Sequence, residues 1–470
     1  MSSETKAKKS KRRKIALISL AVLLSMGGVW GWLEGRPLYY GIQAYIYGFP
    51  LVVMDMTRQV STAVPTAGEF KAPMNQFSVM TRYPDASFRL IPRTGLDTQF
   101  ATAWADLDAE PFVLSVPNTN GRYYVIALFD MWSNVFASIG SRTTGTDSAN
   151  YLLAGPTWHG SAPEGMHVYK SPTRHVWVNG QMLSNGPADY EIVNALQNSY
   201  KLTPLSSWGK PYSPPTHVPV DPDVNTKIQV IEQIKDMDAE AFFSRFANLM
   251  KYNPPADYDT DMIETLISLG ISVEGVFDFN ALKGWQKRAL NRAMGAFSIL
   301  EIGVKKLETK DGWVVMPGNM ANYGTDYLTR AGIALIGLGA IWPADVSYPV
   351  AFNDREEKEL DGANNYMLHF EKDQLPPAKV TWSVSSYDPD GFYVENDINR
   401  YHLAAWMPLK YNDDGSLDIY LQSEKPEGIK EANWLPVPSK GSFNIVTRIF
   451  WPQDNYLSGS WSMPGIKLNN

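Results

Sequence analysis

The sequence predicts a mainly β protein with a helical insert between two β-regions, preceded by a membrane-spanning helix. Short runs of β-branched and aromatic residues alternate with turn clusters over residues 75–180 and again over 311–470. Over 226–310 apolar residues recur instead at spacings of three and four, as on one face of a helix. Nineteen residues without a formal charge, from Ile15 to Leu33, precede both patterns. As a helix they would span roughly 28 Å, close to one bilayer core.

Two connecting regions complete the predicted order of domains. Residues 35–74 follow the apolar run with helical apolar spacing, and residues 181–225 are rich in Pro, Ser and Gly. The predicted parts are a basic cytoplasmic tail (1–14), an anchor or signal (15–33), a helical entry segment (35–74), a first β-region (75–180), a linker (181–225), a helical segment (226–310) and a second β-region (311–470).

Local signals place individual elements within these parts. A helix is expected over 35–60, and Asp238 is an expected N-cap for a helix over 239–251. Asn280 is an expected cap for a longer helix through Leu307.

The β-regions contain runs with clear strand character. Residues 112–116 and 122–129 flank a short loop with Asn and Gly, so we expect a hairpin there. Further strands are expected over 381–387, 391–394, 417–422 and 443–450, separated by turn clusters. Many short strands of this kind indicate a sandwich or jelly roll rather than a parallel sheet.

The N-terminal segment has the features of an uncleaved membrane anchor. Residues 1–14 contain seven cations, which favour a cytoplasmic location for that flank. The apolar run is longer than a secretory signal core and lacks a clear Ala-x-Ala site, while Trp30 and Trp32 suit the membrane interface. We therefore expect a single-pass protein of the inner or cytoplasmic membrane, in contact with lipid through 15–33, with a periplasmic or extracellular body. A cleaved signal is the alternative, and a mature protein beginning near residue 30 would support it.

Composition limits the possible functions. Beyond residue 14 the chain has 35 cations and 48 acids, and such an acidic body argues against nucleic acid as a partner. The absence of cysteine excludes disulfides, thiol catalysis and thiolate metal sites. No phosphate loop, dinucleotide fingerprint or Gly-x-Ser-x-Gly motif occurs, so no nucleotide cofactor is expected.

Two sets of short motifs resemble a known pair of domains. The first set includes Leu96-Asp97-Thr98, Gly121-Arg122-Tyr123-Tyr124, Gly140-Ser141-Arg142-Thr143-Thr144-Gly145 and Trp158-His159-Gly160; the second includes Tyr387-Asp388-Pro389-Asp390-Gly391-Phe392, Asn433-Trp434-Leu435-Pro436 and Trp451-Pro452. The first set resembles the domain of unknown function 1254 (DUF1254) and the second its companion, the domain of unknown function 1214 (DUF1214). The resemblance implies an immunoglobulin-like sandwich, a helical segment and a C-terminal jelly roll, in that order. It implies no established reaction.

Acidic residues near the first β-region are candidates for acid–base chemistry. Strand alternation would place Trp104, Asp106 and Asp108 on one face, with aromatic groups beside carboxylates. Paired carboxylates such as Asp97 and Asp106 can act as acid and base when their environments separate their pKa values. Turn capping is the alternative role for each of these residues.

A flexible polar loop and two aromatic motifs are candidates for ligand binding. The 140–145 loop could hold an anion with Arg142 and backbone N–H groups, or a neighbouring carboxylate could fix Arg142 to position the loop. Tryptophans beside prolines could line a pocket or belong to a core. The ligand-binding candidates are Trp104, Asp130, Arg142, Thr144, Trp434 and Arg448.

Three histidines offer a weak metal-site hypothesis. His159, His167 and His175 are evenly spaced by eight residues, but no His-x-x-x-His or His-Glu-x-x-His motif is present. Solvated or capped loop histidines are the alternative, and no metal is predicted.

Three functions remain open at this level, of which the third is a structural subunit of a larger assembly. The first is a membrane-anchored cell-envelope protein that binds a small molecule or polysaccharide between its two β-domains. The second is an extracytoplasmic hydrolase or lyase that uses Asp97, Asp106 and Arg142 at the domain interface. The sequence leaves open whether the protein is an enzyme.

Overall fold

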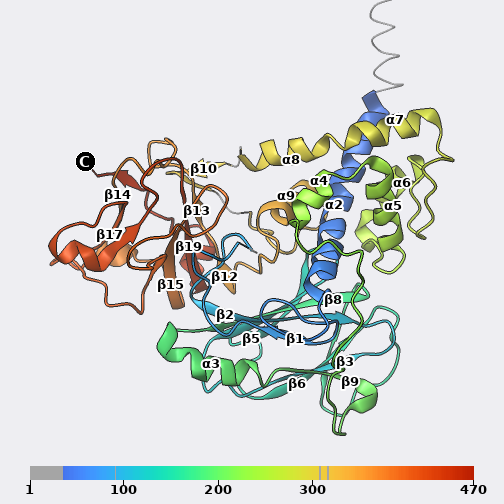
Figure 1. Cartoon of the computed structure of the whole chain (residues 1–470), viewed down its shortest axis with the longest axis horizontal. Coiled ribbons are helices and arrows are strands. Elements are labelled where there is room, and N and C mark those ends of the chain that lie inside the picture. The colour runs from blue at the N-terminus through green and yellow to red at the C-terminus, as the bar shows by residue number, and fades with distance from the viewer. Residues whose placement is uncertain (1–34, 90, 306–307, 315–316, 470) are drawn as a thin grey trace, which may run out of the picture.

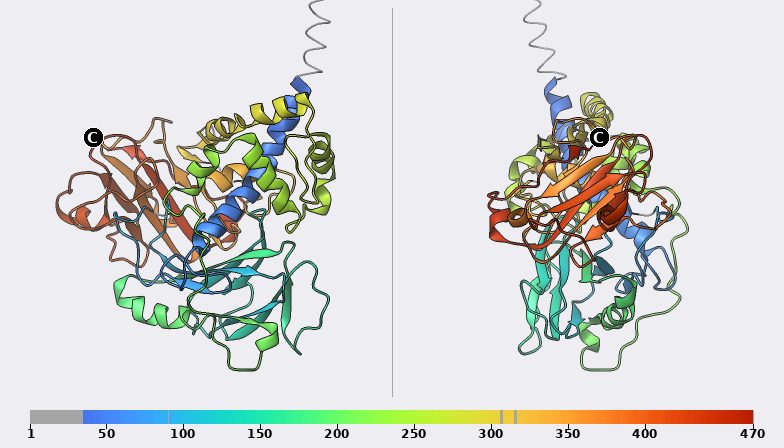
Figure 2. Two further views of the ribbon diagram at one scale, coloured as in Figure 1. Left: turned by 45° about the vertical axis from the view of Figure 1, so that its right-hand side comes forward. Right: turned by 90° about the vertical axis from the view of Figure 1, so that its left-hand side faces the viewer.

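The structure is a computed structural model of the whole chain, and it describes residues 35–89, 91–305, 308–314 and 317–469. Helices gather around one long helix, one β-unit lies below them and the second lies beside both (Figures 1 and 2). The segment 15–33 and the basic tail 1–14 lie outside the described residues, so the anchor stays a prediction. Within the described ranges no helix combines the length and apolar character that a bilayer crossing requires.

The central helix α2 (Arg36–Thr62) is the hub of the helical region. Every residue from Tyr47 to Met56 is buried, so this stretch is covered on all sides. Pro50 in its interior costs about 3 kcal/mol of helix propensity relative to Ala, and the burial of the surrounding apolar side chains offsets that cost. The helix predicted over 35–60 is confirmed.

The other helices of this region pack on α2. They are α4 (Val230–Lys235), α5 (Ala239–Met250), α6 (Thr260–Ser268), α7 (Gly284–Ala293), α8 (Ala296–Lys305) and α9 (Tyr327–Ile336). The predicted cap is confirmed, because the Asp238 carboxylate accepts a hydrogen bond of 2.8 Å from the N–H of Ala241. The single helix predicted from Asn280 is wrong: α7 and α8 are separate, and Gly295 between them has a low helix propensity.

The first β-unit is a two-layer sandwich. One sheet contains, in spatial order, β1 (Phe77–Val79), β2 (Thr98–Asp106), β8 (His175–Leu183), β4 (Tyr124–Phe129) and β5 (Val135–Gly140); the other contains β7 (His167–Lys170), β6 (Ala149–Ala154), β3 (Phe112–Val116) and β9 (Lys201–Pro204). Leu114 and Leu153 from one sheet share a buried core with Ile126 and Val178 from the other. Residues 181–225 contribute α3 (Tyr190–Gln197) as well as β9.

The hairpin predicted over 112–129 is not formed. β3 pairs with β6 and β9, whereas β4 pairs with β8 and β5, so the two strands lie in opposite layers. The connection Pro117–Tyr123 is longer than a two-residue hairpin turn and can cross the roughly 10 Å between packed sheets.

The second β-unit is also two-layered. Its larger sheet contains β10 (Thr309–Lys310), β11 (Trp313–Val314), β13 (Val350–Ala351), β19 (Asn444–Pro452), β15 (Ala378–Tyr387) and β16 (His402–Ala404), with β12 (Val346–Ser347) also paired to β19; the smaller contains β18 (Trp434–Pro436), β17 (Leu417–Gln422), β14 (Tyr366–Phe370) and β20 (Lys467–Leu468). The short α10 (Asp454–Leu457) follows β19. The strands predicted over 381–387, 417–422 and 443–450 correspond to β15, β17 and β19 and are confirmed. The strand predicted over 391–394 is wrong, because these residues belong to the irregular connection between β15 and β16.

The predicted fold class is confirmed at the coarse level, because the chain is mainly β with helices in the middle. The finer assignments of an immunoglobulin-like sandwich and a jelly roll stay predictions.

Candidate functional site

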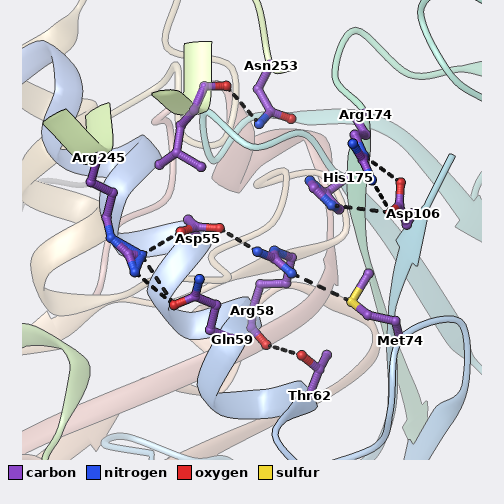
Figure 3. A network of polar contacts seen from close by, with 11 residues as sticks. Asp55, Arg58, Gln59, Thr62, Met74, Asp106, Arg174, His175, Arg245 and Asn253 are labelled. Carbon is purple, nitrogen blue, oxygen red and sulfur yellow. Dashed lines mark hydrogen bonds and ion pairs between the residues drawn. The ribbon is translucent and has the colours of Figure 1, made fainter. Parts of the chain in front are cut away.

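A cavity of about 530 Å³ lies between the helical region and the open end of the first sandwich. Figure 3 shows how α2 and α5 meet the ends of β2 and β8 at this point. We call it the arginine pocket. Its lining residues are Asp55, Arg58, Gln59, Asp106, Arg174, His175, Arg245, Asn248, Leu249, Tyr252 and Asn253.

A buried carboxylate on α2 organises the helical side of the pocket. Asp55 lies in the fully covered stretch of α2 and is only 2% exposed. An unpaired buried carboxylate is costly, and here two guanidinium groups compensate it: Arg58 Nη2 and Arg245 Nη1 each lie 2.7 Å from a carboxylate oxygen. Arg245 also donates to Gln59 Oε1 from Nη2 at 2.8 Å. These contacts fasten α5 to α2 across the pocket.

Arg58 has few hydrogen-bond partners for a side chain that is only 17% exposed. Its Nη2 donates to Asp55, but its Nη1 reaches only the Met74 thioether, a weak acceptor, at 4.0 Å. Its Nε is buried and has no hydrogen-bond partner. A guanidinium group has five N–H donors, so Arg58 retains donors for a ligand.

The sandwich side of the pocket contains a second arginine–carboxylate pair. Arg174 donates to both oxygens of Asp106, from Nε at 2.7 Å and from Nη2 at 2.6 Å. Its Nη1 also lies 3.2 Å from the exposed carboxylate of Asp108 at the rim. Burial raises the pKa of Asp106, but the bonds from Arg174 outweigh it and hold this pKa below its ordinary value.

His175 lies directly opposite Asp106 in the β2–β8 ladder. Its Nε2 is 3.7 Å from Asp106 Oδ2, too long for a hydrogen bond, and its Nδ1 is buried without a partner. Burial, and then the nearby charge of Arg58, lower the pKa of His175 to about 4. The imidazole is therefore neutral at pH 7.

The charges of the pocket favour an anionic ligand. Three guanidinium groups face two carboxylates, and His175 is neutral, so the lining has a surplus of one positive charge. Arginine offers planar, paired N–H donors that match a carboxylate. Asp108 touches only Arg174 from the rim, where solvent screens its charge.

The predicted alternation holds for Trp104 and Asp106, which lie two residues apart in β2, but not for Asp108, which follows the end of the strand. Trp104 has a structural role. Trp104 and Trp177 are direct partners across β2 and β8, and their rings stack at 5.4 Å with an interplanar angle of 6°. Trp104 is buried and Trp177 is partly buried, and the pair lies two residues from Asp106 and His175 on the same strands, where it supports the end of the sheet.

Asp97 and Arg448 lie elsewhere, in a sealed cluster between the two β-units. Arg448 donates to Ser385 Oγ at 3.2 Å, to Tyr387 Oη at 2.9 Å and to the carbonyl of Arg93 at 2.6 Å. Asp97 accepts from Ser383 Oγ at 2.7 Å and is fully buried, which raises its pKa. We call these residues the interdomain cluster: Arg93, Asp97, Ser383, Ser385, Tyr387 and Arg448.

Arg142 is fixed by a neighbouring carboxylate. Its Nε and Nη2 lie 2.7 and 3.0 Å from the two oxygens of Asp345, at the start of the second β-unit. The N–H groups of Thr143, Thr144 and Gly145 all donate to the Gly140 carbonyl, so these amides are already hydrogen-bonded within the loop. Of the two roles predicted for this loop, the geometry supports positioning rather than anion binding.

The acid–base hypothesis required Asp97, Asp106 and Arg142 in one pocket, and the structure does not bring them together. Asp97 immediately precedes β2 and Asp106 is its last residue, so nine residue steps of about 3.3 Å separate them. Arg142 lies in the loop after β5 and is bound to Asp345.

Asp130 caps a turn. It accepts from the N–H groups of Trp132 and Asn134, at 2.8 and 2.9 Å, between β4 and β5. Its burial raises its pKa to about 6.

Trp434 belongs to the core of the second β-unit. It is 6% exposed, and its Nε1 donates to the Gln422 carbonyl at 2.8 Å. It therefore offers no open platform for a ligand.

The three candidate histidines do not converge. His159 and His167 are exposed, and His167 begins β7 in the second sheet, whereas His175 begins β8 in the first. No group of three or more His, Asp or Glu suited to a metal gathers within the described ranges.

Sequence reasoning missed Asp55, Arg58, Arg174 and Arg245. One signal for the α2 part was available: Asp55, Arg58 and Gln59 occupy positions i, i+3 and i+4 at the end of an apolar helical run, where an aqueous face begins. Arg174 and Arg245 carry no local signal, because only the tertiary fold brings them to the same cavity.

The fold and the pocket define a protein of two β-sandwiches linked by a helical region. Its first sandwich corresponds to the match with the protein family of unknown function DUF1254 over residues 74–204, and its second to the match with the family of unknown function DUF1214 over 345–454. The chain is therefore a member of the DUF1254/DUF1214 domain-containing proteins, as the motif resemblance predicted.

A solved structure shows the same fold. The crystal structure of the VPA0106 protein from Vibrio parahaemolyticus matches with a TM-score of 0.67 at 23% identity, covering 92% of this chain and 100% of that one. An uncharacterized protein from Burkholderia cenocepacia matches with a TM-score of 0.42 at 10% identity, covering 96% and 98%. No curated protein matches the chain.

Proposed function

We propose that this protein is a membrane-anchored binding protein of the cell envelope, and that its ligand is a small organic carboxylate held in the arginine pocket. The single observation that carries the ligand assignment is Arg58, which is mostly buried yet gives only one hydrogen bond to an oxygen. A bound carboxylate would supply the missing acceptors.

Charge and size support a monoanion of about monosaccharide size. A single carboxylate would neutralise the positive surplus of the lining, whereas a phosphate dianion would reverse it. The cavity volume of about 530 Å³ falls within the range usual for small-molecule sites. Gln59, Asn248 and Asn253 add amide groups that can hydrogen-bond to hydroxyl groups of a ligand.

This site differs in place from the one that the sequence suggested. The cavity lies between the helices and the first sandwich, not between the two β-units. The anchor rests on the sequence of 15–33 and on the seven preceding cations.

A matched pair of sugars tests the ligand class. Galacturonate and galactose share a pyranose ring, but only galacturonate has a carboxylate. Isothermal titration of the full chain in detergent should detect galacturonate and not galactose. Arg58→Gln should weaken galacturonate binding at least tenfold, since a charge-assisted hydrogen bond contributes about 1.5–3 kcal/mol.

An arginine outside the pocket supplies the control. Arg89 pairs with Asp388 in an exposed salt bridge, so Arg89→Gln should change the affinity less than twofold. Equal losses in the two variants, or equal binding of both sugars, would contradict the proposal. If galacturonate does not bind, a wider panel of monocarboxylates shows whether the sugar ring or the proposed preference for a carboxylate is incorrect.

A further inference from the structure

One end of the helical region combines basic and apolar surface close to the start of α2. Helix α7 packs on the first turns of α2, where the backbone of Ala289 approaches Gly41 so closely that an added Cβ would lie 2.8 Å from its carbonyl oxygen. Figure 1 shows α7 and α8 at the end of the molecule where α2 begins. The predicted anchor, residues 15–33, precedes α2 by two residues.

The charge of this end is opposite to that of the body. From Lys283 to Arg292 the chain has four cations and no acid, although beyond residue 14 acids exceed cations by 13. Lys283, Arg288 and Arg292 are exposed. A basic helix on an acidic body indicates a specific acidic partner rather than general solubility.

Apolar side chains are exposed on the adjoining helix. Ile299 and Ile302, three residues apart on α8, are 44% and 52% exposed. The only acid between them, Glu301, lies 3.7 Å from Lys235, which offsets its charge. Residues three apart lie on the same helix face, so the two isoleucines can enter an apolar layer together.

We propose that α7 and α8 form a docking face for an anionic phospholipid surface, which holds the body against the bilayer in one orientation. This inference rests on the anchor in the proposed function. The basic residues would contact lipid phosphates, and Ile299 and Ile302 would lie at the level of the headgroups. With one end of α2 tethered by two residues to the predicted span, the docking face remains at a high local concentration near lipid.

The absence of cysteine permits a clean test. The full chain with Ile299→Cys, labelled with a fluorophore, is reconstituted into vesicles that contain brominated lipid as a quencher. The control label is Lys201→Cys on β9, in the second sheet of the first sandwich at the opposite end of the molecule. Quenching at 299 should at least double when phosphatidylglycerol replaces a third of the phosphatidylcholine, and quenching at 201 should stay unchanged.

Charge variants separate docking from anchoring. Each cation near an anionic surface contributes about fivefold to association, so Lys283→Glu with Arg288→Glu should return quenching at 299 to its value in neutral vesicles. The control Lys170→Glu with Lys210→Glu makes the same charge change on the first sandwich and should have no effect. An unchanged thermal unfolding midpoint shows that the variants remain folded. Raising the salt to 1 M, where the Debye length is about 3 Å, should weaken the docking in the same way.

Each result decides one part of the proposal. Quenching at 299 that does not depend on phosphatidylglycerol would overturn the docking face, whatever the anchor does. If carbonate washing releases the full chain from vesicles, the anchor is wrong, and quenching at 299 with added anionic vesicles still decides the docking face. A fluorescence change at 299 that follows protein concentration and needs no vesicles would assign the face to a second copy of the chain instead.

Discussion

The arginine pocket and the interdomain cluster contain the same types of residue but are used differently. Arg448, on β19 of the second β-unit, is 4% exposed and donates to three oxygens of the protein, and the segment that contains Arg93 and Gly95 packs over it. Arg58 in the pocket is also mostly buried, but it donates to one oxygen and borders an open cavity. Unused donors beside an open cavity, rather than the presence of an arginine, distinguish the pocket from the structural joint.

This comparison explains why candidate residues from the sequence divide into two groups. Asp97, Arg142 and Arg448 all lie where the two β-units meet and join them. Asp106 lies at the far end of β2, where the sheet ends against α2 and α5, and this end remains open. The arginines at these joints have their partners within the protein, although Asp97 Oδ1 is buried without a hydrogen-bond partner, so these contacts contribute to stability rather than to binding.

The largest expected effect comes from removing the sealed arginine. Arg448→Met leaves Asp97 without a nearby cation, so the free energy of unfolding should fall by about 3–5 kcal/mol in urea denaturation. The exposed Arg89→Gln should change it by at most about 1 kcal/mol. If the single variant does not fold, Asp97→Asn with Arg448→Met removes both charges and should recover part of the loss. A loss below 1 kcal/mol for Arg448→Met would show that the cluster is not a structural joint.

Two buried histidines provide a second comparison between these regions. His402 lies at the interface of the β-units, and its burial, followed by the charge of Arg448, lowers its pKa to about 3; the pKa of His175 in the pocket is about 4. The unfolded chain binds these protons near pH 6.5, before the folded protein does. The contribution of the two histidines to the free energy of unfolding should therefore be constant above pH 6.5. As the pH decreases towards 4, the free energy of unfolding should fall by roughly 3 kcal/mol for each histidine.

Urea denaturation at pH 6.5, 5.5 and 4.5 measures this effect. His402→Gln and His175→Gln should each reduce the acid sensitivity. A saturating carboxylate ligand should raise the pKa of His175, because an anion beside the ring favours the imidazolium. The ligand should therefore protect the His402→Gln variant from acid more than the His175→Gln variant. Equal protection of both variants would place the ligand away from His175.

Local patterns in the sequence predicted those parts of the fold that depend on neighbouring residues. The apolar run of α2, the Asp238 cap and the shared face of Trp104 and Asp106 all follow from helical or strand periodicity. The prediction of a hairpin over 112–129 was wrong because the composition of a strand does not determine which of the two sheets it joins. The loop between the two strands, not their composition, decides this.

The pocket could be predicted only in part for a related reason. Asp106 was identified from its strand, but the other charged residues of the pocket come from α2, α5 and the turn before β8, which are distant in sequence. Arg142 shows the opposite case: its loop composition permitted two roles, and the contact that selects one is with Asp345, 203 residues later. The sequence shows which residue types are present, but the contacts formed in the tertiary structure determine whether those side chains are available to bind a ligand.

Apart from the exposed control variant, the smallest of the expected losses in free energy of unfolding is that of Arg142→Ala. This variant tests directly whether Arg142 joins the two β-units or binds a ligand. Arg142→Ala removes two hydrogen bonds to Asp345, whose side chain is 2% exposed and would retain only Ser138 Oγ at 2.9 Å among these side-chain partners. Because a buried carboxylate loses its charged partner, the free energy of unfolding should fall by about 2 kcal/mol in urea denaturation. The affinity for galacturonate should stay within twofold of that of the unmodified chain, in contrast to Arg58→Gln. A tenfold loss of affinity with unchanged stability would contradict the structural role of Arg142. The 140–145 loop would then belong to the ligand site, and the contact with Asp345 would be dispensable.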